Sequence, residues 1–342
     1  MRVLILGEDA PGGITASYAR AFAELGVQAE TFCLARAYSS VMPMVRARVL
    51  RRIAEPVLLS AFNDYVVRSL RRAEADLVLV VKGHRLAATT IDALRETTDA
   101  PVVNFYPDDP FSGERSNKLA HGPNVLASYD ACFTFARHLI PQYEVVGVRA
   151  VHYLPFARDP ELHAPPTHAI TPEFDVVFVG NLDEQRVRYL EAIADDYDVG
   201  VFGERVRAAI PRGSPLHRAT LGAAAYGVAL SQTLALGLIS LNVMRPQNAG
   251  SHNMRSYESP ACGAFTLSQR TPELTELFAE NDEMACFDSV DALRDSVARW
   301  LADRDRRAAI ARAGFERVRD DTYARRASLM LERAGVVEGA WS

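Results

Sequence analysis

The sequence is poor in the features that mark several common protein classes. It has only four cysteines, and none of them lies in a Cys-x-x-Cys pair, so neither a disulfide framework nor a zinc site is expected. No apolar run approaches the roughly 20 residues that a membrane-spanning helix needs. Each cysteine sits in an apolar stretch, which favours buried free thiols at Cys33, Cys132, Cys262 and Cys286.

The sequence also has no excess of basic residues. Its 38 Lys and Arg are outnumbered by 43 Asp and Glu, which gives a formal net charge of -5. Because nucleic-acid surfaces are normally basic, we expect no nucleic-acid partner. The apolar part of the N-terminus, residues 3–6, is too short for a signal peptide, and no small-residue cleavage site follows it. We therefore expect a cytoplasmic protein whose first strand lies here.

Apolar runs and helical patterns alternate along almost the whole chain. The run Leu77–Val81 is continuous, as in strands that are buried on both faces of a parallel sheet. A helical pattern over Ala87–Thr97 and a further run, Val102–Phe105, follow it. This alternation predicts an α/β fold with doubly wound parallel sheets. The length of 342 residues favours two domains.

Two other segments bear on the domain organisation. Residues 159–173 are polar and contain four prolines, which makes them the best linker candidate. We therefore expect domains over residues 1–158 and 174–320, with a C-terminal helix and tail over 321–342. Residues 37–72 are rich in Arg and carry apolar residues at helical spacing. We favour a long amphipathic helix that packs on its own domain; the alternative is a surface that docks a membrane or an acceptor.

The most informative motif runs from residue 252 to 267, His-Asn-Met-Arg-Ser-Tyr-Glu-Ser-Pro-Ala-Cys-Gly-Ala-Phe-Thr-Leu. Arg255 and Glu258 are three residues apart, so they share one helix face. That face offers a cation for a phosphate and a carboxylate for a ribose diol. The pattern Arg-x-x-Glu-x-x-Ala-Cys-Gly resembles the nucleotide-sugar site of GT-B glycosyltransferases, and the chain looks most similar to their CgeB-like (spore-maturation) branch.

This resemblance implies two facing Rossmann-like domains, with C-terminal helices that pack back toward the first. The nucleotide sugar would sit mainly on the second domain and the acceptor on the first. The donor-binding residues would be Arg255 and Glu258, together with residues of four strand-end or loop segments. These are Gly12 and Gly13 after the first strand, Gly180 and Arg186 at the start of the second domain, Gly203, and Asn253.

Two segments of the first domain carry candidates for the catalytic step. Lys82-Gly83-His84-Arg85 follows a strand, and ligands of open α/β sheets bind at the carboxyl ends of strands. Asp108 and Asp109 follow the next strand and stand between two prolines, and CgeB-like sequences are similar here. One of these carboxylates, with Asp108 preferred because it is nearer the strand end, could deprotonate an acceptor hydroxyl or hydrogen-bond the acceptor sugar. His84 is the next candidate for the base. A plain turn stabilised by the Asp side chains is the structural alternative.

The predicted activity is sugar transfer from a nucleoside-diphosphate sugar to an acceptor hydroxyl, without a metal or other cofactor. Many related glycosyltransferases carry a second Glu eight residues before the ribose-binding one, and here that position is Gly250. Asn248, His252 or Asn253 would have to take its place. This departure keeps a non-catalytic nucleotide- or sugar-binding protein as an alternative. A nucleotide-sugar epimerase is a second alternative, and it would need acid–base groups on both sides of the sugar.

Overall fold

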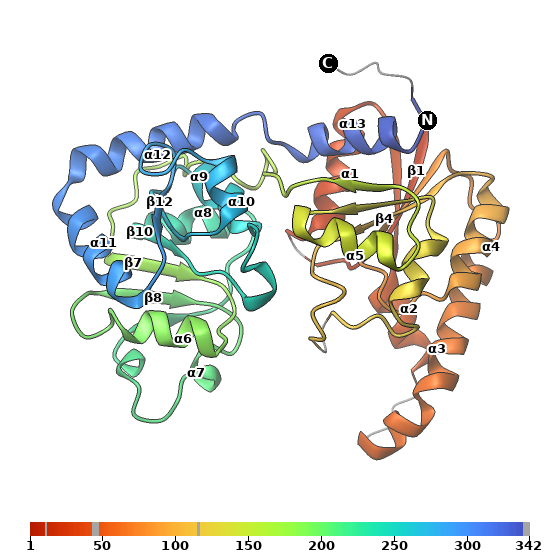
Figure 1. Ribbon diagram of the computed structural model, residues 1–342, viewed down its shortest axis with the longest axis horizontal. Coiled ribbons are helices and arrows are strands. Elements are labelled where there is room, and N and C mark those ends of the chain that lie inside the picture. Colours follow the sequence, from red (N-terminus) through yellow and green to blue (C-terminus); the bar gives the residue numbers. More distant parts are fainter. Residues whose placement is uncertain (11, 43–47, 115–116, 338–342) are drawn as a thin grey trace. The chain divides into compact units, whose positions relative to one another are not determined.

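The chain divides into two compact units. The computed structural model describes residues 1–10, 12–42, 48–114 and 117–337, and the side chains of residues 48–53 also lie outside the description. The first unit comprises Met1–Pro155 and Tyr323–Ser342, and the second comprises Phe156–Thr322 (Figure 1). Residues 159–173, the predicted linker, belong to the second unit. The interpretation of residues 37–72 falls partly on residues 43–47, which lie outside the described part.

The first unit is built on a six-stranded parallel sheet in the order β2-β1-β3-β4-β5-β6. Its central strands are apolar and buried at almost every position, as the continuous apolar runs predict. The strands are β1 (Arg2–Gly7), β2 (Gln28–Cys33), β3 (Leu77–Val81), β4 (Val102–Tyr106), β5 (Ala131–Thr134) and β6 (Val151–Tyr153). The helices are α1 (Ile14–Glu24), α2 (Leu34–Val41), α3 (Arg48–Leu70), α4 (Ala88–Thr98), α5 (Ile140–Val145), α13 (Tyr323–Arg333) and the short 3-10 helices η1 (Pro123–Ser128) and η2 (Arg137–Leu139).

The second unit repeats this design with the strand order β12-β11-β10-β7-β8-β9, again all parallel. Its strands are β7 (Phe174–Val179), β8 (Val199–Phe202), β9 (Thr220–Gly222), β10 (Gly237–Asn242), β11 (Thr266–Gln269) and β12 (Ala285–Phe287). Its helices are α6 (Glu184–Glu191), α7 (Val206–Ala209), α8 (Val228–Ala235), α9 (Arg255–Ala261), α10 (Pro272–Leu277), α11 (Val290–Ala302), α12 (Arg304–Val318) and the 3-10 helices η3 (Pro215–His217) and η4 (Pro246–Asn248).

Side-chain caps fix where several helices of the second unit begin. Asp183, Thr271, Ser289 and Asp303 each accept a hydrogen bond from the backbone N–H three residues further on. These bonds satisfy donors that the first turn of a helix otherwise leaves free. The core beneath the helices consists of strand residues such as Val201, Ile239 and Leu267, together with Trp300 of α11. The predicted α/β fold with doubly wound parallel sheets is confirmed.

The last helix belongs to the first unit, although it follows the whole second unit in the sequence (Figure 1). α13 packs along α1, with the ring of Tyr323 5.1 Å from that of Tyr18 in an edge-to-face contact. Arg326 donates from Nε to the carbonyl oxygen of Pro155 at 3.0 Å. The predicted return of the C-terminal helix is therefore present, whereas α11 and α12 stay in the second unit.

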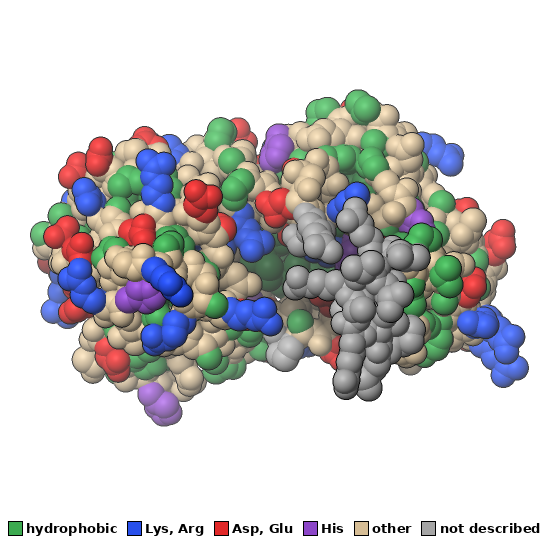
Figure 2. All heavy atoms as spheres, turned by 90° about the horizontal axis from the view of Figure 1, so that it is seen from below, with side chains coloured by type: hydrophobic (Ala, Val, Ile, Leu, Met, Phe, Trp, Pro, Cys, Tyr) green, Lys and Arg blue, Asp and Glu red, His purple; other side chains and the backbone are tan. Residues whose placement is uncertain are grey.

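The structure also bears on the expectations for the cysteines, the membrane spans and the surface charge. All four cysteines are free, and Cys132, Cys262 and Cys286 are buried, whereas Cys33 is only half-buried. No helix in the described part of the chain is long and apolar enough to cross a membrane. On the face seen in Figure 2, acidic and basic side chains are interspersed, in keeping with the modest net charge.

Candidate functional site

Each sheet has one place where the strand order reverses, and ligands of open α/β sheets bind at the carboxyl ends of the strands at such a place. In the second unit the reversal lies between β7 and β10, and in the first unit between β1 and β3. The carboxyl end of β7 leads into Gly180, and that of β3 leads into Lys82 and His84. The predicted site residues therefore gather at two sheet edges, one in each unit.

Arg255 and Glu258 lie together at the edge of the second sheet. Arg255 donates from Nη1 to Glu258 Oε2 at 2.8 Å, and its Nη2 lies 3.4 Å from the carbonyl oxygen of Val179 at the end of β7. The Glu258 side chain is only 6% exposed, whereas that of Arg255 is 18% exposed. A buried carboxylate needs a partner, because an unpaired buried charge is costly. The pair thus presents one cation and one fixed carboxylate at the strand ends.

The guanidinium of Arg186 is held by the backbone. Its Nε and Nη2 donate to the carbonyl oxygen of Val243 at 3.1 and 2.9 Å, and its Nη1 donates to that of Asn181 at 2.8 Å. Burial lowers the pKa of Arg186 to about 10, and the nearby Asp183 opposes this shift. These contacts clamp the turn after β7 to the end of β10. A phosphate would have to compete with these carbonyl oxygens for the guanidinium. The role of Arg186 as a donor-binding residue therefore stays a prediction.

A second basic side chain, Arg245, lies in the same region and was missed by the sequence reasoning. Its Nε is 3.9 Å from Asp183 Oδ2, and the side chain is 35% exposed, so it is more accessible than that of Arg186. Its position just after β10 could have indicated a site residue, because ligands of such sheets bind at the carboxyl ends of the strands. Arg245 therefore joins Arg255 as a cation that a diphosphate could reach.

A network of amides and hydroxyls ties the end of β10 to the start of α9. Asn253 donates from Nδ2 to Asn242 Oδ1 at 2.8 Å, and its own Oδ1 accepts from the N–H of Ser256 at 3.1 Å. Asn242 is buried and also donates to Ser268 Oγ at 3.1 Å. Asn253 thus places the first turn of α9, which carries Arg255.

Of the three residues considered in place of the missing Glu at position 250, two are occupied inside the unit. His252 is fully buried, accepts the N–H of Phe156 at Nε2 (3.2 Å) and has Nδ1 3.2 Å from Glu273 Oε1. Asn248 is buried and donates to the carbonyl oxygen of His252 at 3.0 Å. Only Asn253 is partly exposed. A sugar ring would therefore meet Asn253 rather than the other two.

Gly180 and Gly203 lie where β7 and β8 end, and their backbones nearly touch. The N–H of Gly180 donates to the carbonyl oxygen of Phe202 at 2.8 Å. A Cβ at Gly203 would stand 2.2 Å from the carbonyl oxygen of Gly180, which no side chain tolerates. The structure thus supplies a packing reason for Gly203, and nucleobase binding at this position stays a prediction. The exposed Tyr226, whose hydroxyl donates to Glu204 Oε1 at 3.1 Å, offers an aromatic face beside this edge.

In the first unit, β3 and β4 are neighbouring parallel strands, so the residues that follow their carboxyl ends lie close together. Lys82 donates from Nζ to Asp108 Oδ2 at 2.7 Å, and both side chains are about one-fifth exposed. Lys82 has a positive φ of 65°, and Gly83 follows with φ 62°, so the chain turns sharply there. Burial lowers the pKa of His84 to about 4, helped by the positive charges of Arg85 and Lys82. His84 is therefore neutral at pH 7 and a weak base.

Asp109 differs from its neighbour in its surroundings. Its Oδ1 accepts from the N–H of Phe111 at 2.8 Å, which closes the turn expected for such a sequence. Burial raises the pKa of Asp109 above its ordinary value of 3.8, while the hydrogen bond to Phe111 and the nearby His138 oppose this shift. A carboxylate with a raised pKa is a stronger base than an ordinary one. Both Asp108 and Asp109 are half-buried at the sheet edge.

The glycine loop after β1 has a local structural role as well. Gly12 has a positive φ of 67°, which glycine adopts without strain, and Gly13 donates its N–H to the carbonyl oxygen of Ala10 at 2.9 Å. Gly13 is the N-cap of α1 and offers no side chain to cap it, so backbone amides of the first turn remain available to an anion. Pro11, between these residues, lies outside the described part.

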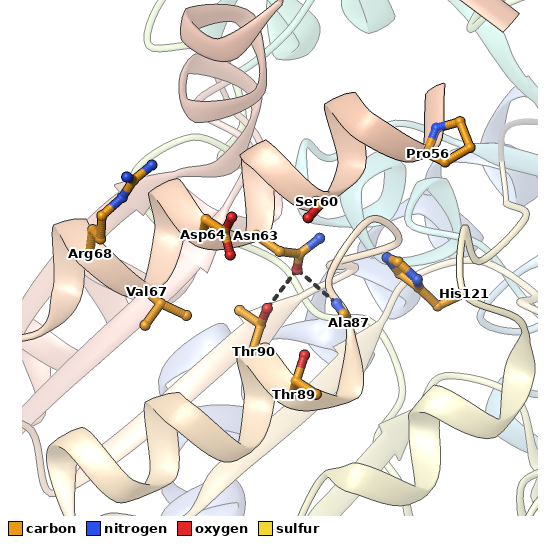
Figure 3. Close-up of a pocket in the computed structure, with 10 residues that line it drawn as sticks. All are labelled: Pro56, Ser60, Asn63, Asp64, Val67, Arg68, Ala87, Thr89, Thr90 and His121. Atoms are coloured by element: carbon orange, nitrogen blue, oxygen red, sulfur yellow. Dashed lines mark hydrogen bonds between the residues drawn. The ribbon is translucent and has the colours of Figure 1, made fainter. Parts of the chain in front are cut away.

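A pocket of about 510 Å³ opens between α3 and the start of α4 in the first unit (Figure 3). Asn63 joins its two walls: its Oδ1 accepts from Ala87 N and Thr90 Oγ1, and its Nδ2 donates to the carbonyl oxygens of Leu59 and Arg85. Four hydrogen bonds give Asn63 a structural role. The other lining residues are both polar and apolar, and they include Ser60, Asp64, Arg68, Thr89 and His121 as well as Pro56 and Val67. Sequence reasoning missed this pocket, because its walls come from helices whose packing no motif indicates.

Asp-x-Asp sequences do occur in the chain, at Asp196–Asp198 and Asp303–Asp305. Asp198 directly precedes β8, at the end of the sheet opposite to the candidate site, and Asp303 caps α12. Among the described residues, no group of three or more His, Cys, Asp or Glu side chains is arranged to hold a metal ion. These acidic pairs thus lie outside the candidate site.

Residues 184–332 match a family model described as "Glycosyl transferase-like". A search of the curated proteins gives no match. Among solved structures, HepE from Anabaena in complex with UDP and glucose is similar, with a TM-score of 0.68 and 12% identity over 98% of this chain and 100% of that one.

Two further structures have the same architecture. Sucrose-phosphate synthase from Thermosynechococcus elongatus matches with a TM-score of 0.65 and 14% identity over 96% of this chain and 97% of that one. The β-glucosyltransferase of phage T4 matches with a TM-score of 0.60 and 12% identity over 98% and 99%. The fold is therefore that of the GT-B glycosyltransferases, and its second half carries a glycosyltransferase-like sequence.

Proposed function

We propose that the protein is a glycosyltransferase that moves a sugar from a nucleoside-diphosphate sugar to an acceptor hydroxyl. The observation that carries the proposal is the Arg255–Glu258 pair at the carboxyl end of β7, on a helix within the family match. A basic residue beside a diphosphate stabilises the leaving group, and a fixed carboxylate accepts from ribose hydroxyls. HepE, of similar fold, was solved with UDP-glucose. The finer assignment to the CgeB-like branch, and a hexose as the transferred sugar, belong to this proposal.

We further propose that the acceptor binds to the first unit, near Asp108, Asp109 and His84. The pocket between α3 and α4 lies close to this edge, since Asn63 in its wall donates to the carbonyl oxygen of Arg85 in the His84 loop. Its volume is in the range of small-ligand sites. In the second unit, Tyr226 would give the nucleobase an aromatic face to stack on.

The direct test is a binding and turnover screen. Thermal-shift measurements with nucleoside diphosphates and nucleotide sugars should identify one nucleobase whose ligands stabilise the protein. A ligand that binds only the folded chain raises the melting temperature of the protein. The matching nucleotide sugar should then be hydrolysed slowly or transferred to an added acceptor. Binding without any hydrolysis or transfer would favour the non-catalytic alternative, which Gly250 motivates. Interconversion of two nucleotide sugars would favour an epimerase.

Removing the carboxylate of Glu258 is expected to weaken binding of the nucleoside diphosphate by about 1–3 kcal/mol, the scale of a lost charged hydrogen bond. Calorimetry on Glu258→Ala and on the isosteric Glu258→Gln measures this. Glu276→Ala is the matched control, because Glu276 is an exposed residue of the same unit. Unchanged affinity in a folded Glu258→Ala variant would remove Glu258 from the site.

We also propose that no divalent cation is needed, so nucleotide binding and turnover should persist in excess chelator. Arg255 and Arg245 would neutralise the diphosphate in place of an ion, since charge-assisted bonds to phosphate oxygens are strong. The measurement is turnover after treatment with chelator, compared with the same sample after magnesium or manganese is restored. Full loss that either metal reverses would contradict the proposal, with Asp108 and Asp109 then the first ligands to test.

A further inference from the structure

The segment before the second sheet packs on α8 and on α9, the helix that carries Arg255 and Glu258. Ser231 of α8 donates from Oγ to the carbonyl oxygen of Ala164. Pro165 packs against Gly263 at the end of α9, where a Cβ would come within 3.3 Å of the proline ring. The segment is therefore fixed over α8 and α9 within the second unit.

This anchoring brings His163 onto Glu258. The ring is 2% exposed, and its Nε2 lies 3.6 Å from Glu258 Oε1. The N–H of Asp159 donates to His163 Nδ1 at 3.0 Å. A nitrogen that accepts a hydrogen bond carries no proton, so the neutral ring must hold its proton on Nε2, the atom that faces Glu258.

The charges around the ring agree with a neutral His163. Burial lowers its pKa, Glu258 and Asp159 act to raise it, and Arg255 and Arg158 act to lower it. Glu258 in turn has Arg255 at Oε2 and His163 at Oε1, both from inside the protein. Each carboxylate oxygen has a second lone pair, so both can still accept from a ligand.

We infer that His163 is a positioning residue that holds the carboxylate of Glu258 in the orientation that receives the ribose hydroxyls of the donor. This role rests on the proposed function. Outer partners that orient a binding group are a general feature of preorganised sites. His163 contributes no contact to the donor; it acts through Glu258.

The first test needs no nucleotide. Nitrogen NMR of the full chain with ¹⁵N-labelled histidine should show His163 as the neutral Nε2–H tautomer at pH 7.5, with its signals assigned by their loss in His163→Asn. The Glu258→Gln variant should shift these ring signals. A proton on Nδ1, or signals that do not respond to Glu258→Gln, would overturn the inference.

The second test is a double-mutant cycle on affinity for the tightest-binding of UDP, GDP, ADP and dTDP. His163→Asn, which cannot reach Glu258, should weaken binding about tenfold, because the carboxylate loses the N–H that faces its Oε1. His163→Gln, which can place an N–H near the position of Nε2, should stay within about threefold of the wild type. In the Glu258→Ala background, His163→Asn should cost nothing further, because its effect passes through Glu258. His168→Asn, an exposed histidine close by in the sequence, is the control.

The possible results separate the two claims. If the losses of His163→Asn and Glu258→Ala simply add while both variants keep the wild-type melting temperature, His163 has no positioning role. If His163→Asn unfolds, the comparison of His163→Gln with wild type decides, and a tenfold loss there contradicts the inference. If the wild-type chain binds none of the four nucleotides, the proposed function is refuted and the donor role falls with it, while the nitrogen signals still report whether His163 contacts Glu258.

Discussion

Replacing the catalytic carboxylate by its amide is expected to lower turnover about 10²–10⁴-fold while nucleotide affinity stays nearly unchanged, because the change removes a proton acceptor and keeps the shape. The candidates are Asp108 and Asp109, in the variants Asp108→Asn and Asp109→Asn. The structure separates the two residues. Asp108 is paired with Lys82, whereas burial raises the pKa of Asp109, whose Oδ1 accepts from the backbone N–H of Phe111.

Two controls tell base catalysis from a structural effect. Lys82→Met breaks the ion pair but leaves Asp108 in place, so a loss that Lys82→Met reproduces belongs to the pair rather than to proton transfer. In Asp109→Asn the amide oxygen can still accept from Phe111, which preserves the turn. The pH profile gives an independent readout: if Asp109 is the base, kcat/KM should fall on the acid side around a pKa above 3.8, and this limb should vanish in Asp109→Asn. Normal turnover in both variants would leave the pair as a turn and make His84 the next residue to replace.

The Gly203→Ala substitution is expected to destabilise the second unit by about 3 kcal/mol, at the upper end of the cost of overpacking. The added Cβ would stand 2.2 Å from the carbonyl oxygen of Gly180, and a backbone atom in a hydrogen-bonded sheet edge cannot move aside as a flexible side chain can. The ends of β7 and β8 would have to separate. Urea unfolding of the two proteins measures the loss as a lower midpoint.

The matched control for this change is Gly180→Ala, one strand away. There the nearest atom to the new Cβ is Cζ of the Phe178 ring at 3.3 Å, and a small shift of the ring relieves the contact. Gly180→Ala should therefore cost much less than Gly203→Ala. Equal unfolding midpoints for Gly203→Ala and wild type would show that the strand ends are looser than their backbone distance implies.

The sheets and most helices could be predicted from the sequence because strands that are buried on both faces form continuous apolar runs. β3 is five consecutive apolar residues, and the structure buries all of them. β9 was missed, because it is only three residues long and stands at the sheet edge, where Gly222 packs against the ring of Phe202. Such a strand forms because it pairs with β8, and its own sequence shows no strand pattern.

The candidate site was predictable where it depends on local spacing and not where it depends on contacts between distant segments. Arg255 and Glu258 meet because they are three residues apart on a helix. His163 reaches Glu258 from a proline-rich stretch 95 positions earlier, and the composition of that stretch indicates only a linker. For Arg186 the position near a turn suggested a contact with the ligand. In the structure the guanidinium donates to backbone carbonyl oxygens, and no sequence pattern indicates such contacts.

The return of α13 to the first unit sets an order of events during synthesis. The second unit is one continuous stretch, Phe156–Thr322, so all of it is synthesised before Tyr323 is added. The first unit waits for Tyr323 and Arg326, which pack on Tyr18 and bond Pro155. Although domains made first usually fold first, here the unit that contains Met1 is the last to be completed, because α13 packs on α1 and is synthesised after the whole second unit.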